Sequence, residues 1–219
     1  MNSPNHDARP GDALIDHLVL HYTGMVTGAA AIERLCDPVA KVSSHYVVGE
    51  TGAIHCLVAE DRRAWHAGIS FWRGIRALND RSIGIEIVNP GHEWGYVPFP
   101  APQIAAVRAL CRDILRRHPI PPRNVVGHSD IAPDRKQDPG ELFPWRALAA
   151  AGVGLWTDAQ ADPGDPLAGL AAIGYDVSLG SAPAIAAFQR RFRPARCDGV
   201  PDPETVGRIA AVQRLFNEP

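Results

Sequence analysis

Hydrophobic and polar residues alternate with two different periods along the first 150 residues. Two segments, 27–36 and 102–118, place apolar side chains at helical spacing, and prolines bound the longer one. Because strand-like and helix-like segments interleave, we expect an α/β fold in which a mixed central β-sheet is flanked by helices. The segments that are short, apolar and β-branched, as strands are, cover residues 15–21, 44–48, 53–58, 82–88 and 124–127.

The pattern changes after Trp156. The following ten residues are small, polar and rich in proline, which indicates a linker. Beyond them, three short segments again have helical spacing, so we expect a small three-helix domain at the C-terminus. The predicted organisation is a first domain at 1–155, a linker at 156–166 and a helical domain at 167–219.

Composition and charge exclude several classes of protein. With 46% hydrophobic and 21% charged residues, the 219-residue chain resembles an ordinary globular protein. The net charge of −2 argues against a nucleic-acid partner, since such proteins usually carry a basic face. No apolar run approaches the roughly 18 residues that a membrane span needs.

The four cysteines and the N-terminal residues bear on the compartment. The cysteines are scattered without a C-x-x-C pair, which predicts reduced thiols rather than a disulfide scaffold or a cysteine zinc site. Residues 1–16 are polar and lack the apolar stretch of a signal peptide. We therefore expect a cytoplasmic protein, with a periplasmic location as the alternative if a signal sequence is missing from this chain.

Histidines and carboxylates gather where strands are expected to end. His21 closes the first strand, on the same face as His17, and the loop 127–140 holds His128 and Asp138. A catalytic zinc site takes three protein ligands and leaves one position open, so His128, Asp138 and one distant histidine would suffice. The alternatives are a solvated loop of mixed charge and hydrogen-bonded structural histidines, which is the role we assign to His17.

Glu86 interrupts an otherwise apolar strand. The isoleucines at 83, 85 and 87 face one side, while Glu86 shares the other side with Gly84, whose missing side chain leaves room for an approaching group. A buried unpaired carboxylate costs several kcal/mol, in order of magnitude. Glu86 is therefore either paired with an arginine or a tuned acid–base group.

Several motifs now identify a resemblance. Over residues 15–150 the chain closely resembles the zinc-dependent N-acetylmuramoyl-L-alanine amidases of the type 2 family, relatives of the peptidoglycan recognition proteins. The motifs that carry the resemblance are LVLHYT (18–23), SSHYVV (43–48), AWHAG (64–68), LNDRSIGIEIVN (78–89), VGHSDIAPDRKQDPG (126–140) and FPW (143–145).

The resemblance implies roles for individual residues. It makes His21, His128 and Asp138 the zinc ligands, Glu86 the catalytic carboxylate, and Lys136 a group that assists at the carbonyl oxygen. Four further residues are expected to contact substrate. Three of them match family positions around the cleft, although His45 and His66 could equally be framework hydrogen-bonding groups, and Asn79 lies in the stretch before the glutamate strand. These four are His45, Trp65, His66 and Asn79.

The C-terminal segment is similar to the small three-helix peptidoglycan-binding domain. The D-G-x-x-G-P-x-T pattern of that domain recurs at 198–205, with Asp202 where glycine is expected. The alternative is a helical cap that only stabilises the amidase. If the segment binds glycan, a chain that ends near Trp156 should still cleave small muropeptides but lose activity on intact sacculi. If the segment is a structural cap, that shortened chain should fail to fold.

The activity implied by the resemblance is hydrolysis of the amide bond between N-acetylmuramic acid and L-alanine. The expected partners are peptidoglycan fragments, with no obligatory protein partner, and the expected role is recycling of 1,6-anhydro-muropeptides. The alternatives are an envelope amidase that acts on intact peptidoglycan and a non-catalytic muropeptide-binding protein of the same fold. A zinc peptidase is disfavoured because the chain has no H-E-x-x-H motif.

Overall fold

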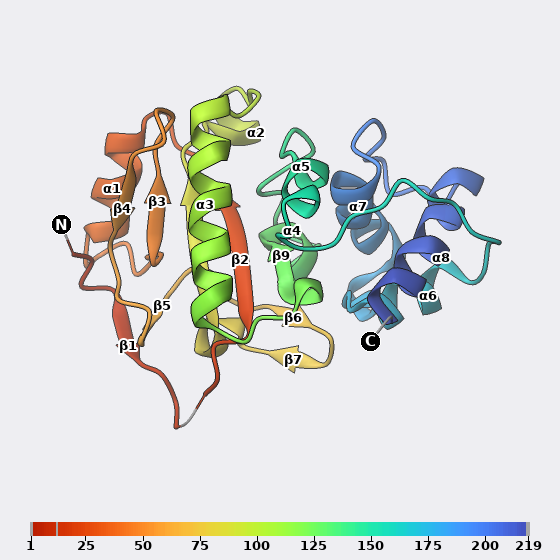
Figure 1. The fold of residues 1–219 in the computed structure, drawn as a ribbon, viewed down its shortest axis with the longest axis horizontal. Coiled ribbons are helices and arrows are strands. Elements are labelled where there is room, and N and C mark those ends of the chain that lie inside the picture. The colour runs from red at the N-terminus through yellow and green to blue at the C-terminus, as the bar shows by residue number, and fades with distance from the viewer. Residues whose placement is uncertain (1, 12, 218–219) are drawn as a thin grey trace.

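A twisted five-stranded sheet forms the centre of the computed structural model, which describes residues 2–11 and 13–217 (Figure 1). Four neighbouring strands run parallel, and the fifth, β4, pairs antiparallel at one edge. The strand order is β4 (Ile54–Cys56), β3 (Tyr46–Val48), β8 (Ser82–Ile87), β2 (His17–Tyr22) and β9 (Val125–Gly127).

One face of this sheet is apolar and covered by the long helix α3 (Ala101–Arg117), which crosses in front of the strands in Figure 1. Leu18 and Leu20 of β2 join the isoleucines of β8 and the buried stripe of α3 in one hydrophobic cluster. The side chains between them, including His21 and Glu86, therefore face away from α3. The predicted division of the two strands into an apolar and a polar face is thus present in the fold.

Shorter elements surround the sheet. Helix α1 (Gly28–Cys36) begins at Thr27, whose side chain accepts a hydrogen bond from the amide of Ala30, as an N-cap does. The remaining elements before residue 160 are β1 (His6–Ala8), β5 (Arg62–Ala64), β6 (Phe71–Trp72), β7 (Ile75–Arg76), η1 (Leu78–Arg81), α2 (Gly91–Trp94), η2 (Pro122–Asn124), α4 (His128–Ile131) and α5 (Trp145–Ala150).

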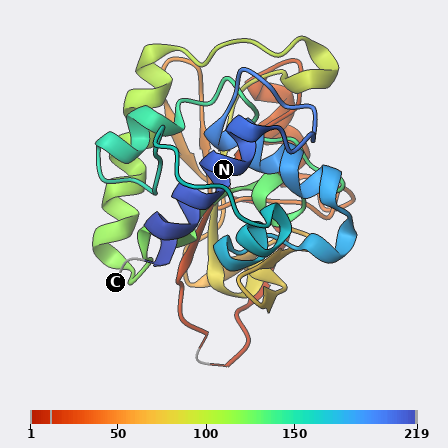
Figure 2. The same cartoon turned by 90° about the vertical axis from the view of Figure 1, so that its right-hand side faces the viewer.

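The C-terminal elements lie against the edge of the sheet formed by β9, on the right of Figure 1 and towards the viewer in Figure 2. They are α6 (Pro166–Ile173), η3 (Val177–Leu179), α7 (Ser181–Phe192) and α8 (Pro203–Asn217).

The C-terminal helices share a hydrophobic core with the sheet. Val19, Trp72 and Val126 belong to the same buried cluster as Phe188 and Phe192 of α7. Within this cluster, the ring of Trp72 meets that of Tyr175 edge-on, with 5.1 Å between the ring centroids. The contact between the sheet and the C-terminal helices is thus built largely from apolar side chains.

A buried ionic cluster lies in the same contact. Arg191 of α7 contacts Asp130 of α4 at 2.9 Å, and both side chains are 1% exposed. The hydroxyl of Tyr175 donates to the other carboxylate oxygen of Asp130 at 2.7 Å. Because α4 begins with His128, the C-terminal helices directly support the element that carries this histidine.

The predicted fold class is confirmed, and the strongly patterned elements form close to their expected bounds. The strand pairs β1–β5 and β6–β7 and the short helices α2, α4 and α5 were not expected from the sequence. These elements are two to six residues long, too short to display a hydrophobic period. Among the described residues, no helix combines the length and the apolarity that crossing a membrane requires.

Candidate active site

Two neighbouring parallel strands present polar side chains at their carboxyl ends. In the register of β2 and β8, His21 is the partner of Glu86, so both side chains lie on the face opposite α3. His128 follows directly after β9, the other neighbour of β2. In open α/β sheets, ligands bind at this edge because the loops that follow the strands meet there.

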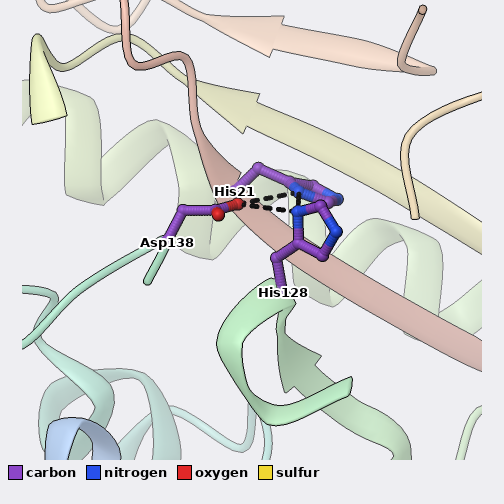
Figure 3. Close-up of side chains that lie close together, drawn as sticks. All are labelled: His21, His128 and Asp138. Atoms are coloured by element: carbon purple, nitrogen blue, oxygen red, sulfur yellow. Dashed lines mark hydrogen bonds and ion pairs between the residues drawn. The ribbon is translucent and has the colours of Figure 1, made fainter. Parts of the chain in front are cut away.

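His21, His128 and Asp138 converge on one point (Figure 3). The Nδ1 atoms of the two histidines are 3.0 Å apart, and each is 3.0 Å from Oδ2 of Asp138. An ion about 2.0–2.2 Å from each donor, the range found for zinc with nitrogen and oxygen ligands, can contact all three atoms at this spacing. The structure therefore brings the three predicted ligands into a group that can bind a metal.

The electrostatics of this group suit a cation. Burial, and next the neighbouring His128, lower the pKa of His21 to about 4, so its imidazole is neutral at pH 7. Burial opposes ionisation of Asp138, but the two histidines outweigh it and hold its pKa well below the ordinary value. A neutral imidazole and an ionised carboxylate are the forms in which these side chains ligate metals.

A cavity of about 540 Å³ opens at this point. This volume is within the range of pockets that bind small molecules. Glu86, His128, Lys136 and Asp138 line it from several sides, together with Trp65 and other residues of the adjoining loops. Two of the three predicted ligands, His128 and Asp138, and both predicted catalytic residues therefore face one common space.

Glu86 presents a buried carboxylate to the cavity. Its Oε2 atom is buried and has no hydrogen-bond partner among the described residues, so the alternative of an arginine pair receives no support. Burial, and next the charge of Asp138, raise the pKa of Glu86 well above its ordinary value, while Lys136 opposes the shift. Such a carboxyl group holds a proton more readily than an ordinary glutamate does, a property typical of acid–base catalysts.

The four residues predicted to contact substrate separate into two groups. Trp65 and His66 line the cavity, and the indole of Trp65 is anchored through Nε1 to Asp7 at 2.7 Å. Asn79 is buried and hydrogen-bonded to backbone amides, and it lines a smaller hollow beside the cavity. His45 is fully buried and does not line the cavity.

His45 instead joins two parts of the framework. Its Nδ1 accepts a hydrogen bond from the amide of Gly84, and its Nε2 lies 3.1 Å from the carbonyl oxygen of Arg62. Both ring nitrogens are thus used within the fold, which supports the framework alternative for this residue. His17 is also fully buried, with Nδ1 2.5 Å from Asp16, and it stands apart from the cavity lining.

Two groups next to the site were not found from the sequence. The hydroxyl of Ser82 contacts Nε2 of His66 at 3.1 Å, and the carbonyl oxygen of Ala67 lies 3.2 Å from Nε2 of His128. Serine at the start of a strand is an ordinary residue, and a backbone carbonyl leaves no trace in the sequence. Only their place between motif residues could have drawn attention to them.

Comparison with known proteins agrees with this geometry. The family model for N-acetylmuramoyl-L-alanine amidase (Amidase_2) matches residues 10–141, more than half of the chain. The chain therefore belongs to the N-acetylmuramoyl-L-alanine amidase family, and the predictions of the family and of an amidase enzyme are confirmed.

Relatives match over different lengths. The N-acetylmuramoyl-L-alanine amidase AmiD of Escherichia coli (strain K12) is 42% identical and matches 92% of this chain and 83% of its own. The solved complex of E. coli AmiD with the substrate anhydro-N-acetylmuramic acid-L-Ala-D-gamma-Glu-L-Lys has a TM-score of 0.84 at 38% identity and covers 97% of this chain and 94% of that chain.

The 1,6-anhydro-N-acetylmuramyl-L-alanine amidase AmpD of E. coli (strain K12) is 36% identical, with 65% of this chain and 85% of its own matched. The match to AmiD thus covers far more of this chain than the match to AmpD.

Proposed function

We propose that this protein is a zinc-dependent amidase that cleaves the bond between the lactyl group of N-acetylmuramic acid and L-alanine in anhydro-muropeptides. One observation carries the proposal: two members of a convergent His–His–Asp group line the same cavity as Glu86, whose Oε2 atom has no hydrogen-bond partner among the described residues. The solved complex of AmiD with an anhydro-muropeptide supports the substrate class.

The donor set fits zinc. Two imidazoles, which ligate metals in their neutral form, and one carboxylate would leave the ion a net positive charge, and three protein ligands are the usual number in catalytic zinc sites. When bound, zinc lowers the pKa of a coordinated water towards ~7 and polarises a carbonyl group. His21, His128 and Asp138 would hold the ion.

Glu86 acts as the general base and acid in this proposal. Its unpartnered Oε2 is free to accept the proton of the attacking water, because no side chain among the described residues competes for it. The same carboxyl group then returns the proton to the departing amine of L-alanine. Its raised pKa suits the first step, because a more basic carboxylate accepts the proton of water more readily.

Lys136 stabilises the negative charge that develops on the carbonyl oxygen. Its side chain lines the cavity and is close enough to Glu86 and His21 to influence the pKa of both. A fixed positive charge contributes more to the charged transition state than to the neutral amide, so it accelerates the reaction.

Replacing Glu86 tests the proposed function. We expect the protein to convert anhydro-muropeptides into free anhydro-N-acetylmuramic acid and stem peptide, as measured by mass spectrometry of digests. Glu86→Gln should keep its zinc while kcat falls about 10²-fold or more, the range for loss of general acid–base catalysis. The surface variant Glu33→Gln serves as the matched control. Near-normal turnover in Glu86→Gln would refute the mechanism.

Replacing Lys136 tests the oxyanion role. We expect Lys136→Ala to retain zinc and to lose roughly 10²–10³ in kcat, as when an oxyanion donor is removed. Lys136→Arg keeps the positive charge and should recover part of the loss. If both variants turn over equally, charge at this position does not stabilise the transition state.

The polymeric state of the substrate and the compartment are part of the proposal. We propose soluble anhydro-muropeptides as substrates and a cytoplasmic location, which the four free cysteines support because thiols persist in reducing compartments. Digests of fragments beside intact sacculi, with fractionation of the native cell, test both points. Recovery in the envelope and preference for sacculi would favour the alternative of an envelope amidase.

A further inference from the structure

In each of the two candidate ligand histidines, the ring nitrogen that faces away from the proposed metal position makes a specific contact. Nε2 of His21 is 3.0 Å from Nδ1 of His66, and Nε2 of His128 is 3.2 Å from the carbonyl oxygen of Ala67. A neutral imidazole carries one N–H, so whatever fixes the proton on Nε2 leaves Nδ1 free to ligate.

The hydrogen bonds at His21 form a series that runs through His66 to Ser82. The direction of each bond follows from the last member of the series, Ser82. A carbonyl oxygen only accepts, so the hydroxyl of Ser82 donates to the carbonyl of Leu78, 2.5 Å away. The hydroxyl oxygen of Ser82 can then accept from Nε2 of His66 at 3.1 Å. Nδ1 of His66 is consequently unprotonated and accepts from Nε2 of His21, which leaves Nδ1 of His21 with a lone pair.

A single hydrogen bond places the proton of the His128 imidazole on Nε2. The carbonyl oxygen of Ala67 can only accept, so Nε2 of His128 is the donor. Nδ1 of His128 therefore also carries a lone pair. Both lone pairs and the carboxylate of Asp138 face a common point with no proton between them, an arrangement that a cation satisfies.

The two hydrogen-bond acceptors, Nδ1 of His66 and the carbonyl oxygen of Ala67, belong to adjacent residues. The side chain of Asn79 holds both residues in place. Oδ1 of Asn79 accepts the backbone N–H of His66 at 3.1 Å and that of Ala67 at 2.7 Å. The ring of His66 needs the space beside Gly84, because a Cβ there would lie 2.4 Å from Cγ of His66. Asn79 and Gly84 thus fix where the segment lies.

We propose that His66 and Ala67, held by Asn79, set the tautomers of His21 and His128 and thereby preorganise the metal site. The inference rests on the proposed function, since it concerns the metal that the amidase would bind. It makes His66 and Asn79 positioning residues, whereas the sequence predicted a substrate contact for Asn79 and left His66 open between substrate and framework. Groups that orient a metal ligand in this way typically contribute 10–100-fold to metal affinity.

The test is competition for Zn²⁺ between the full-length protein and a chelator of known affinity. We expect His66→Ala to bind zinc about 10–100-fold more weakly than the wild type. His66→Asn should bind within a few-fold of the wild type, since its amide oxygen can replace the Nδ1 acceptor. His17→Asn, which alters another buried imidazole that contacts Asp16 outside this series of hydrogen bonds, should leave zinc affinity unchanged.

A nitrogen-15 NMR spectrum of the imidazoles in the zinc-loaded wild type tests the same point without a variant. We expect Nε2–H and a metal-bound Nδ1 for both His21 and His128. Equal zinc affinity in the wild type and His66→Ala, or ligation through Nε2 of His21, would overturn the inference alone. A wild-type protein that binds no zinc would instead overturn the proposed function.

Discussion

Asp138→Ala is expected to lose bound zinc and amidase turnover together. The variant removes the only carboxylate of the convergent group and leaves two imidazole nitrogens 3.0 Å apart without a negative charge. Three protein ligands are the usual minimum of a catalytic zinc site, so the two that remain should hold the ion weakly. His128→Ala should behave in the same way. Metal analysis of the purified variants, beside a muropeptide assay, measures both losses.

His17→Ala provides the matched control for the ligand variants. His17 begins the same strand as His21 and is equally buried, but its imidazole contacts Asp16 and not the cavity. Its replacement should therefore leave metal content and turnover intact, with thermal unfolding recorded to follow any loss of stability. If His17→Ala removes zinc while His21→Ala retains it, the assignment of ligands is wrong.

The sequence predicted the faces of the central strands but not how the strands are paired. Alternation along β2 and β8 placed His21 and Glu86 opposite the apolar positions, and the structure agrees. The register that makes these two residues neighbours depends on pairing between segments about 65 positions apart, which no local pattern contains. The motifs, rather than periodicity, linked the loop that holds Asp138 to this edge of the sheet.

The roles of the histidines around the site show a similar limit. His45 and His66 both belong to motifs of the family, and the sequence left each of them open between substrate and framework. The structure separates them because β3 lies beside β8, so the ring of His45 is enclosed and accepts from Gly84. His66 comes instead from the segment after β5 and reaches both the cavity and His21. Tertiary placement, which sequence spacing does not encode, decides between the two roles.

Removing residues 157–219 is expected to abolish cooperative folding, which favours the structural cap over an independent module. The deletion would expose Trp72, Val19 and Val126 where they now share a buried cluster with the C-terminal helices. It would also leave Asp130 buried in α4 without Arg191 or Tyr175. Circular dichroism during thermal unfolding, with turnover of an anhydro-muropeptide, measures the outcome. A shortened chain that unfolds cooperatively and cleaves small fragments at the normal rate would instead support the independent module predicted from the sequence.

A single substitution separates the ionic part of this contact from the apolar part. Arg191→Met keeps much of the side-chain volume but leaves the Asp130 carboxylate buried and unpaired, which typically costs about 3–5 kcal/mol. Because domains are stable by only about 5–15 kcal/mol, this loss should be clear in denaturant unfolding. Arg190→Met, on the same helix but only partly buried, is the control and should have little effect. The loss in free energy of unfolding caused by Arg191→Met should be smaller when Asp130 is also replaced by asparagine, because the uncompensated charge is then gone. A loss that persists in the double variant would assign the effect to packing of the Arg191 guanidinium on Trp145, 4.2 Å from its ring centroid.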